Sequence, residues 1–199
     1  MENKRIKNVV STILSHFWGK LERIDFDYHF KKGGWKRLSH EAYGKNDGVA
    51  ILLYNSQKQT VLLSRQFRIP VYVAGVNQGY SIEVCGGSVD KGESPEACVI
   101  REAQEELGYK VSHVTSISTV FLSPGIVRER VHLFIGEYSD ADKIDDVGGG
   151  LEIENEEIEV LELSFEEALK MIDSNKIIDA RTIMLMHYLK VKGIMEVKN

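Results

Sequence analysis

One stretch of the chain, residues 87–109, carries glycines, carboxylates and an arginine at spacings that fix a loop followed by a helix. Ser94 is suited to cap this helix, Pro95 to open it and Gly108 to end it. At about 100° per residue, apolar side chains fall on one side of the helix and glutamates on the other. We predict that the core side holds Val99, Ile100, Ala103 and Leu107, and the opposite side Glu102, Glu105 and Glu106.

The three glutamates are the chemically informative part of this helix. Like charges three or four residues apart repel, at a cost of roughly 0.2–0.5 kcal/mol per pair, unless a cation neutralises them. Mg²⁺ and Mn²⁺ are hard cations that prefer oxygen ligands. The cluster therefore predicts a site for Mg²⁺, with Mn²⁺ as the alternative, and hydrolysis of a phosphoanhydride.

The order of residues in this stretch resembles the signature of the Nudix hydrolase family. It runs Gly87-x5-Glu93-x7-Arg101-Glu102-Ala103-x-Glu105-Glu106-x-Gly108-Tyr109. Every fixed position of the signature is present, and only Ala103 and Tyr109 depart from the bulky aliphatic residues usual at two further positions. The resemblance implies an α+β fold, the α/β/α sandwich of the Nudix type, and metal-dependent cleavage of a nucleoside diphosphate linked to another group.

Length and composition fit one catalytic domain with an extension. A chain of 199 residues with 43% hydrophobic content can bury one core, and we expect it in residues 44–199, after a β-hairpin extension in residues 1–43. A net charge of −5, with basic residues scattered, argues against polymeric nucleic acid as a partner. No apolar run approaches the ~20 residues that span a membrane, so we expect a cytoplasmic protein. Cys85 and Cys98 are expected to be buried, reduced thiols.

The remaining elements follow from periodicity and capping residues. Residues 21–30 and 35–43 predict one hairpin, and residues 48–54 and 60–67 another. Further strands are expected at 80–85, 111–122, 130–138 and 158–163. Ser164 and Asp179 should cap helices that run to about residues 174 and 192. Because strands and helices do not alternate regularly, α+β is favoured over a doubly wound sheet.

A second set of residues resembles one group within the family. Pro124 lies fifteen residues past Tyr109, a placement that marks Nudix enzymes acting on ADP-ribose and related sugar nucleotides. Segments 48–55, 65–68, 148–152, 158–163 and 179–182 are similar to the GDP-mannose pyrophosphatase branch. The implied reaction takes GDP-mannose to GMP and mannose 1-phosphate. ADP-ribose or an ADP-sugar is the alternative substrate, and a non-catalytic nucleotide-binding module or an acidic adaptor protein would be a different function class.

Catalytic roles are carried over from the same resemblance. The implied metal ligands are Glu102, Glu106, Glu156 and the backbone carbonyl of Gly86. Arg101 is expected to orient a carboxylate, Glu93 or Glu105, and Glu105 belongs to the catalytic set. The general base should come from the acidic loop after residues 148–150; Glu156 is the first choice, with Glu154, Glu157 and Glu129 as the alternatives.

The GDP-mannose branch also implies substrate contacts. Arg68 is expected at a phosphate and Arg181 at a phosphate or the sugar. Trp18 is expected to stack on the base or to anchor an interface. The N-terminal hairpin should cross to the other subunit of a homodimer. The full set of expected substrate contacts is Trp18, Ser39, His40, Glu41, Arg68, Gly86, Gly87, Glu106, Glu129, Asn155, Glu156 and Arg181.

Overall fold

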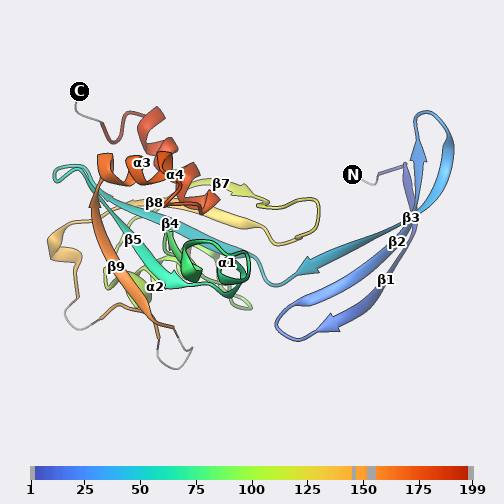
Figure 1. Ribbon diagram of the computed structural model, residues 1–199, viewed down its shortest axis with the longest axis horizontal. Helices are drawn as coiled ribbons and strands as arrows, with labels where there is room; N and C mark the ends of the chain where they lie inside the picture. The colour runs from blue at the N-terminus through green and yellow to red at the C-terminus, as the bar shows by residue number, and fades with distance from the viewer. Residues whose placement is uncertain (1–2, 145–146, 152–155, 197–199) are drawn as a thin grey trace. The chain divides into compact units, whose positions relative to one another are not determined.

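The computed structural model describes residues 3–144, 147–151 and 156–196. They belong to two compact units (Figure 1). The first comprises residues 1–47 and 121–130, and the second residues 48–120 and 131–199. The segment 121–130 thus belongs with the N-terminal extension, and the division into 1–43 and 44–199 stays a prediction.

The first unit is a three-stranded antiparallel sheet of long strands. They are β1 (Ile6–His16), β2 (Lys20–Phe30) and β3 (Gly34–Gly44), in the order β1-β2-β3. The hairpin of β2 and β3 confirms the prediction for residues 21–43, whereas β1 was not expected as a strand. The end of β3 holds the 121–130 segment, because the amide of Tyr43 donates to the carbonyl of Ile126 at 2.8 Å.

The second unit is built on a six-stranded mixed sheet. Its strands are β4 (Gly48–Asn55), β5 (Thr60–Phe67), β6 (Tyr80–Glu83), β7 (Thr115–Val120), β8 (Val131–Glu137) and β9 (Ile158–Ser164). The order is β6-β5-β4-β8-β7, and β9 pairs with β5. Among these described strands, β4 and β8 pair in parallel and the other neighbours pair antiparallel. This mixture confirms the α+β expectation.

The pairing of β5 opens a place for the loop after β6. Residues 60–62 of β5 pair with β4, whereas residues 64–67 pair with β6. The chain that leaves β6 then runs beside β4, where the amide of Ile51 donates to Cys85 and the amide of Val49 to Gly87, both at 2.9 Å. This pairing fixes the backbone on either side of Gly86.

Helices cover both faces of the sheet, as expected for an α/β/α sandwich. α3 (Phe165–Asp173) and α4 (Ala180–Val191) lie on one side and α2 (Pro95–Leu107) on the other (Figure 1). Alternate residues of β4 serve the two cores: Leu52 packs with the α3 and α4 side chains, and Ile51 with those of α2. The short elements α1 (Ile69–Val73), η1 (Asn77–Gly79) and η2 (Asp140–Asp142) complete the fold.

The predicted caps and thiols are confirmed. The side chain of Ser164 accepts from the amide of Glu167 at 3.1 Å, and that of Asp179 from Thr182 at 2.9 Å. Cys85 and Cys98 are buried and free. Within the described part of the chain, no helix is both long and apolar enough to cross a membrane.

Candidate active site

The helix that carries the motif, α2, begins and ends where the sequence predicts. The hydroxyl of Ser94 accepts a hydrogen bond from the amide of Ala97 at 3.1 Å. Gly108 closes the helix at φ +75°, a left-handed conformation that favours glycine. Among the apolar side chains, the buried side differs from the prediction at one place, because Ile100 is only half-buried and Cys98 takes part instead.

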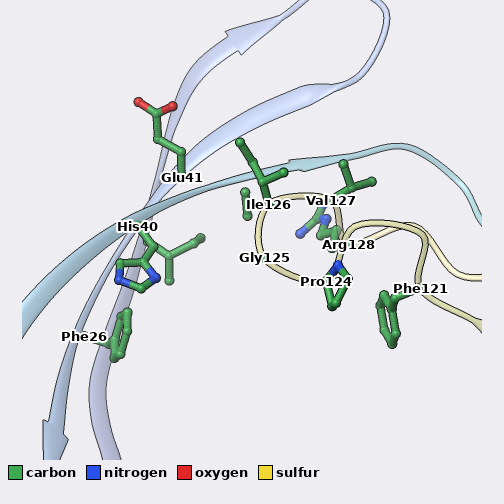
Figure 2. Close-up of a pocket in the computed structure, with 11 residues that line it drawn as sticks. Phe26, His40, Glu41, Phe121, Pro124, Gly125, Ile126, Val127 and Arg128 are labelled. Atoms are coloured by element: carbon green, nitrogen blue, oxygen red, sulfur yellow. The ribbon is translucent and has the colours of Figure 1, made fainter.

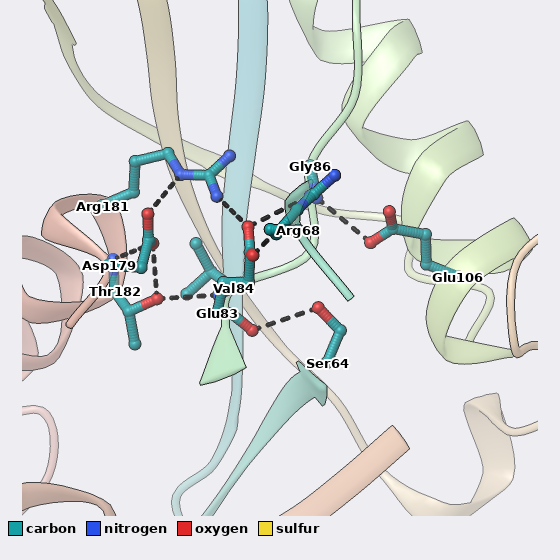
Figure 3. Close-up of polar contacts among 9 residues, drawn as sticks. All are labelled: Ser64, Arg68, Glu83, Val84, Gly86, Glu106, Asp179, Arg181 and Thr182. Carbon is teal, nitrogen blue, oxygen red and sulfur yellow. Dashed lines mark hydrogen bonds and ion pairs between the residues drawn. The ribbon is translucent and has the colours of Figure 1, made fainter. Parts of the chain in front are cut away.

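The sequence suggested that Glu106 lies opposite the core, which is wrong: its side chain is buried, with only 2% exposed. It follows Ala103 by three residues and Val99 by seven, so it shares their face of the helix. Its carboxylate accepts a hydrogen bond from the amide of Gly86 at 3.2 Å (Figure 3). A buried carboxylate is costly as an anion unless it is paired or neutralised.

The pKa of Glu106 reflects this position. Burial is the largest influence and raises the pKa to about 7, with further upward contributions from the charges of Glu102 and Glu156. Hydrogen bonds from Cys85 and Gly86 act in the opposite direction. Burial likewise raises the pKa of Glu102, although Arg101 opposes it. The charges of Glu102 and Glu156 are therefore close enough to Glu106 to disfavour its negative charge.

Arg101 gathers the other carboxylates of the motif. Its Nη1 donates to Glu102 at 2.9 Å and to Glu105 at 2.8 Å, and its Nε and Nη2 donate to the two oxygens of Glu93, each at 3.2 Å. The expectation that Arg101 orients Glu93 or Glu105 is confirmed for both contacts. Glu102 is held in the same fork, so its orientation is fixed as well.

The two glycines before the helix are required by close approach. A Cβ at Gly87 would lie 1.9 Å from a carboxylate oxygen of Glu102, and a Cβ at Gly86 would lie 2.4 Å from the carbonyl oxygen of Val49. Neither position has room for a side chain. The backbone of this loop can therefore run against both β4 and the carboxylates of α2.

The glycine run 148–150 docks on the end of α2. Gly148, Gly149 and Gly150 have φ of +109°, +94° and +83°. The amide of Gly149 donates to the carbonyl of Glu106 at 2.8 Å, and that of Gly150 to the carbonyl of Glu105 at 3.3 Å. This contact fixes the glycine run against the helix that carries the motif.

Glu156, the expected general base, lies close enough to the α2 glutamates to influence them. Its charge raises the pKa of both Glu102 and Glu106, and its side chain accepts from the amide of Leu151 at 3.4 Å. Glu157 is exposed. The alternative base Glu154 and the expected substrate contact Asn155 lie outside the described residues.

Arg68 and Arg181 meet at a buried glutamate that the sequence did not single out. Arg68 donates from Nε and Nη2 to the two oxygens of Glu83, at 3.0 and 3.1 Å, and Arg181 pairs with the same carboxylate (Figure 3). Burial raises the pKa of Glu83, but the two arginines hold it below its usual value. The alternation of apolar and polar residues in 80–85 did not predict the burial of Glu83. Alternation suggests that the polar residues face solvent, whereas Ser81 and Glu83 are both buried. The only available signal was a carboxylate in a largely apolar strand, since such residues are seldom buried unpaired.

The other expected substrate residues belong to the first unit. Ser39 donates a hydrogen bond to Asp25, and the ring of His40 meets that of Phe26 edge-on at 5.4 Å. Trp18 is exposed, with the ammonium of Lys45 4.2 Å from its ring centroid.

A hollow of about 410 Å³ lies in this unit, and its largely apolar wall includes His40, Glu41 and Pro124 (Figure 2). Glu129 lies in the 121–130 segment and is half-buried. The carboxylates of α2 lie in the second unit, so whether these residues share one site stays a prediction.

The donor chemistry of the α2 cluster fits a divalent ion. Among the described residues, no three His, Cys, Asp or Glu side chains meet at a spacing that would hold an ion as they stand. However, Glu102, Glu106 and Glu156 offer only oxygen atoms, and the charge of Glu156 disfavours the negative charge of Glu102 and Glu106, which a cation would relieve. The carbonyls of Cys85 and Gly87 are occupied by β4. Because successive carbonyls of an extended chain alternate in direction, that of Gly86 is expected to point away from β4.

Comparison with known families agrees with this geometry. The NUDIX domain model matches residues 44–185. The chain belongs to the Nudix family. The resemblance inferred from the motif is thereby confirmed, and Nudix pyrophosphatases generally use divalent metal ions. A second model, the GDP-mannose pyrophosphatase NudK N-terminal domain, matches residues 5–43.

Nudix relatives of this chain are similar over nearly their whole length. A protein of Pectobacterium atrosepticum is 45% identical over 185 residues, which are 93% of this chain and 94% of the relative. One from Salmonella paratyphi B is 43% identical over 194 residues, 98% and 100% of the two chains. One from Escherichia coli O1:K1 is 42% identical over 193 residues, 97% and 99% of the two. Each of these relatives is called GDP-mannose pyrophosphatase.

Proposed function

We propose that this Nudix protein hydrolyses GDP-mannose to GMP and mannose 1-phosphate, with Mg²⁺ as its metal ion and Mn²⁺ as an alternative. Water adds across the diphosphate: one P–O bond breaks, and the oxygen of water completes one of the two phosphates. The observation that carries the proposal is the contact of Glu102 and Glu106 with the Gly86–Gly87 loop in a Nudix domain, with Glu156 near enough for its charge to raise the pKa of both. The relatives named GDP-mannose pyrophosphatase favour this substrate over ADP-ribose or an ADP-sugar.

The residues that would hold the ion are Glu102, Glu106, Glu156 and the carbonyl of Gly86. A divalent ion there would neutralise the diphosphate oxygens and the developing charge. Arg101 keeps Glu102 and Glu105 in place. Glu105 then supports catalysis indirectly, because it accepts from the same Arg101 that orients Glu102, and it does not touch the substrate.

Glu156 is proposed to take the proton from the attacking water. Backbone hydrogen bonds from Gly149 and Gly150 to the carbonyls of Glu106 and Glu105 anchor the chain that leads to this residue on the end of α2. Proton transfer to a placed carboxylate is the step that this residue would contribute.

Substrate recognition is proposed to use both units. Arg68 would meet a phosphate, Arg181 a phosphate or the sugar, and Trp18 would stack on the base. The residues proposed to complete the contacts are Ser39, His40, Glu41, Gly87 through its backbone, Glu129 and Asn155.

A homodimer is proposed from the first unit. Its strand β1 exposes large apolar side chains along its length, among them Val9, Val10, Ile13 and Leu14. A small sheet needs an apolar face packed against something to be stable. The N-terminal segment of a second copy, exchanged between subunits, would supply that cover. The buried free thiols fit a reducing compartment, and the cytoplasm is the proposed location.

The test is a comparison of kcat/KM for GDP-mannose, ADP-ribose and ADP-glucose at one Mg²⁺ concentration. GDP-mannose should exceed the other two at least tenfold. A preference for ADP-ribose would keep the Nudix pyrophosphatase chemistry and move the substrate to the alternative. No turnover of any of the three with Mg²⁺ or Mn²⁺ would favour a non-catalytic nucleotide-binding module.

A further inference from the structure

Glu83 joins three separate parts of the second unit. It lies on β6, three residues before Gly86, and its side chain is only 4% exposed. Arg68 follows the end of β5, and Arg181 lies in the first turn of α4. Both guanidinium groups end on this one carboxylate (Figure 3).

The arrangement leaves part of each arginine unused. Arg68 donates from Nε and Nη2 to Glu83, so its Nη1 takes no part in the pair. The side chain of Arg68 is 39% exposed. Arg181 donates from Nε to Asp179, at 3.0 Å, and from Nη2 to Glu83. A guanidinium has five N–H donors in a planar fork, so each arginine keeps donors for an anion.

The surroundings of Glu83 make this fork rigid. Asp179 also accepts from the amide of Thr182, and the hydroxyl of Thr182 accepts from the amide of Val84 at 2.8 Å. The carbonyl of Glu83 itself accepts from the hydroxyl of Ser64 at 3.3 Å. Side chains fixed before binding lose little conformational entropy when they bind.

We propose that Glu83 is a positioning residue, which holds Arg68 and Arg181 so that their remaining donors grip one anionic group of the substrate. The inference rests on the proposed function and adds a residue to it. Glu83 does not touch the substrate. It acts through the arginines, and therefore on binding in both the ground and the transition state.

The test is the effect of Glu83→Gln on steady-state hydrolysis of GDP-mannose. KM should rise at least tenfold while kcat stays within about threefold, as expected when uniform binding is lost. In a double-mutant cycle, Arg68→Ala should raise KM markedly in the wild-type protein but by less than threefold in the Glu83→Gln background. Additive effects of the two changes, or an unchanged KM in Glu83→Gln, would overturn the inference.

Two variants separate positioning from mere structure. Thr182→Val removes a buried hydroxyl that supports the fork but leaves both arginine–glutamate pairs in place, so its KM should rise by less than threefold, well below the rise for Glu83→Gln, even if its melting temperature falls. Glu159→Gln removes an exposed partner of Arg65, 2.8 Å away, and should change neither quantity. A rise in KM for Thr182→Val equal to that of Glu83→Gln would mean that the cluster is only structural.

A further variant covers the case in which Glu83→Gln does not fold. Glu83→Asp keeps the charge but is one methylene too short to serve both arginines, and its KM should rise at least threefold. An unchanged KM there also overturns the inference. Failure of the proposed function looks different, because the wild-type protein itself would then not hydrolyse GDP-mannose.

Discussion

The backbone amide of Gly86 donates a hydrogen bond to the buried carboxylate of Glu106, 3.2 Å away. The residues on either side of Gly86 are bonded to β4, so this amide has a fixed position. The contact ties the loop before α2 to the last turn of that helix. It holds the Glu106 carboxylate against the backbone of this loop before any substrate arrives.

Glu106→Gln tests this contact directly. Glutamine keeps the length and the helix propensity of glutamate but removes the charge that would hold a cation. At pH 7.5 we expect kcat to fall by at least about 10²-fold. Calorimetric melting should show little loss of stability, because a buried charge is removed. Undiminished turnover at equal stability would rule out the role given to Glu106.

The pH dependence of stability in the metal-free protein follows from the same residue. The pKa of Glu106 is about 7 in the folded chain against an ordinary value of 4.5, and that of Glu102 is raised too. Between these values the folded protein binds more protons than the unfolded one, so its stability falls as pH rises from about 4.5 to 7.

With metal removed by a chelator, the melting temperature should therefore drop between pH 5 and pH 7. The drop should be smaller in Glu106→Gln, whereas Glu157→Gln, on the exposed part of the loop, should keep the wild-type difference. Identical pH profiles for wild type and Glu106→Gln would contradict the assignment of this proton.

The loop base is tested by comparing neighbouring glutamates. If Glu156 accepts a proton in the transition state, Glu156→Gln should lower kcat by about 10²–10⁴-fold and change KM little. Glu157→Gln and Glu154→Gln serve as controls on the same loop and should have small effects. A large drop in kcat at either of those positions would keep the general base on this loop but assign it to that residue. If none of the three variants lowers kcat, Glu129 becomes the candidate base.

The interface proposed for β1 can be broken by one charge. Ile13 is 54% exposed, and Ile13→Glu would place a carboxylate in an apolar contact between subunits. We expect monomers by analytical ultracentrifugation, with KM for GDP-mannose raised at least tenfold. Thr12→Glu, one residue earlier and opposite Arg23 on β2, is the control and should remain dimeric. A monomeric Ile13→Glu with unchanged KM would refute a site shared between subunits.

Local signals explain which elements could be predicted from the sequence. The limits of α2, α3 and α4 depend on caps such as Ser94, Ser164 and Asp179, whose side chains bond amides three residues away. Strand β1 was missed because it is exposed along its whole length, so burial imposes no period on its residues. The five-residue helix α1 is too short to show a helical period.

The site could be predicted from the sequence only where the residues in contact are close together along the chain. Glu102, Glu105 and Arg101 are neighbours on one helix, and their contacts follow from its geometry. The burial of Glu106 depends on the loop at Gly86, and that of Glu83 on arginines 15 and 98 residues away. Such pairings are decided by strand order, which spacing along the chain does not reveal.

The products formed from GDP-mannose test the central claim most directly. Separated by anion exchange, they should be GMP and mannose 1-phosphate in equal amounts with Mg²⁺, absent when a chelator is added and restored when Mg²⁺ is returned. GDP with free mannose would mean that the glycosidic bond breaks instead of the diphosphate. Either that outcome or undiminished turnover in chelator would contradict a carboxylate-held metal acting on the diphosphate.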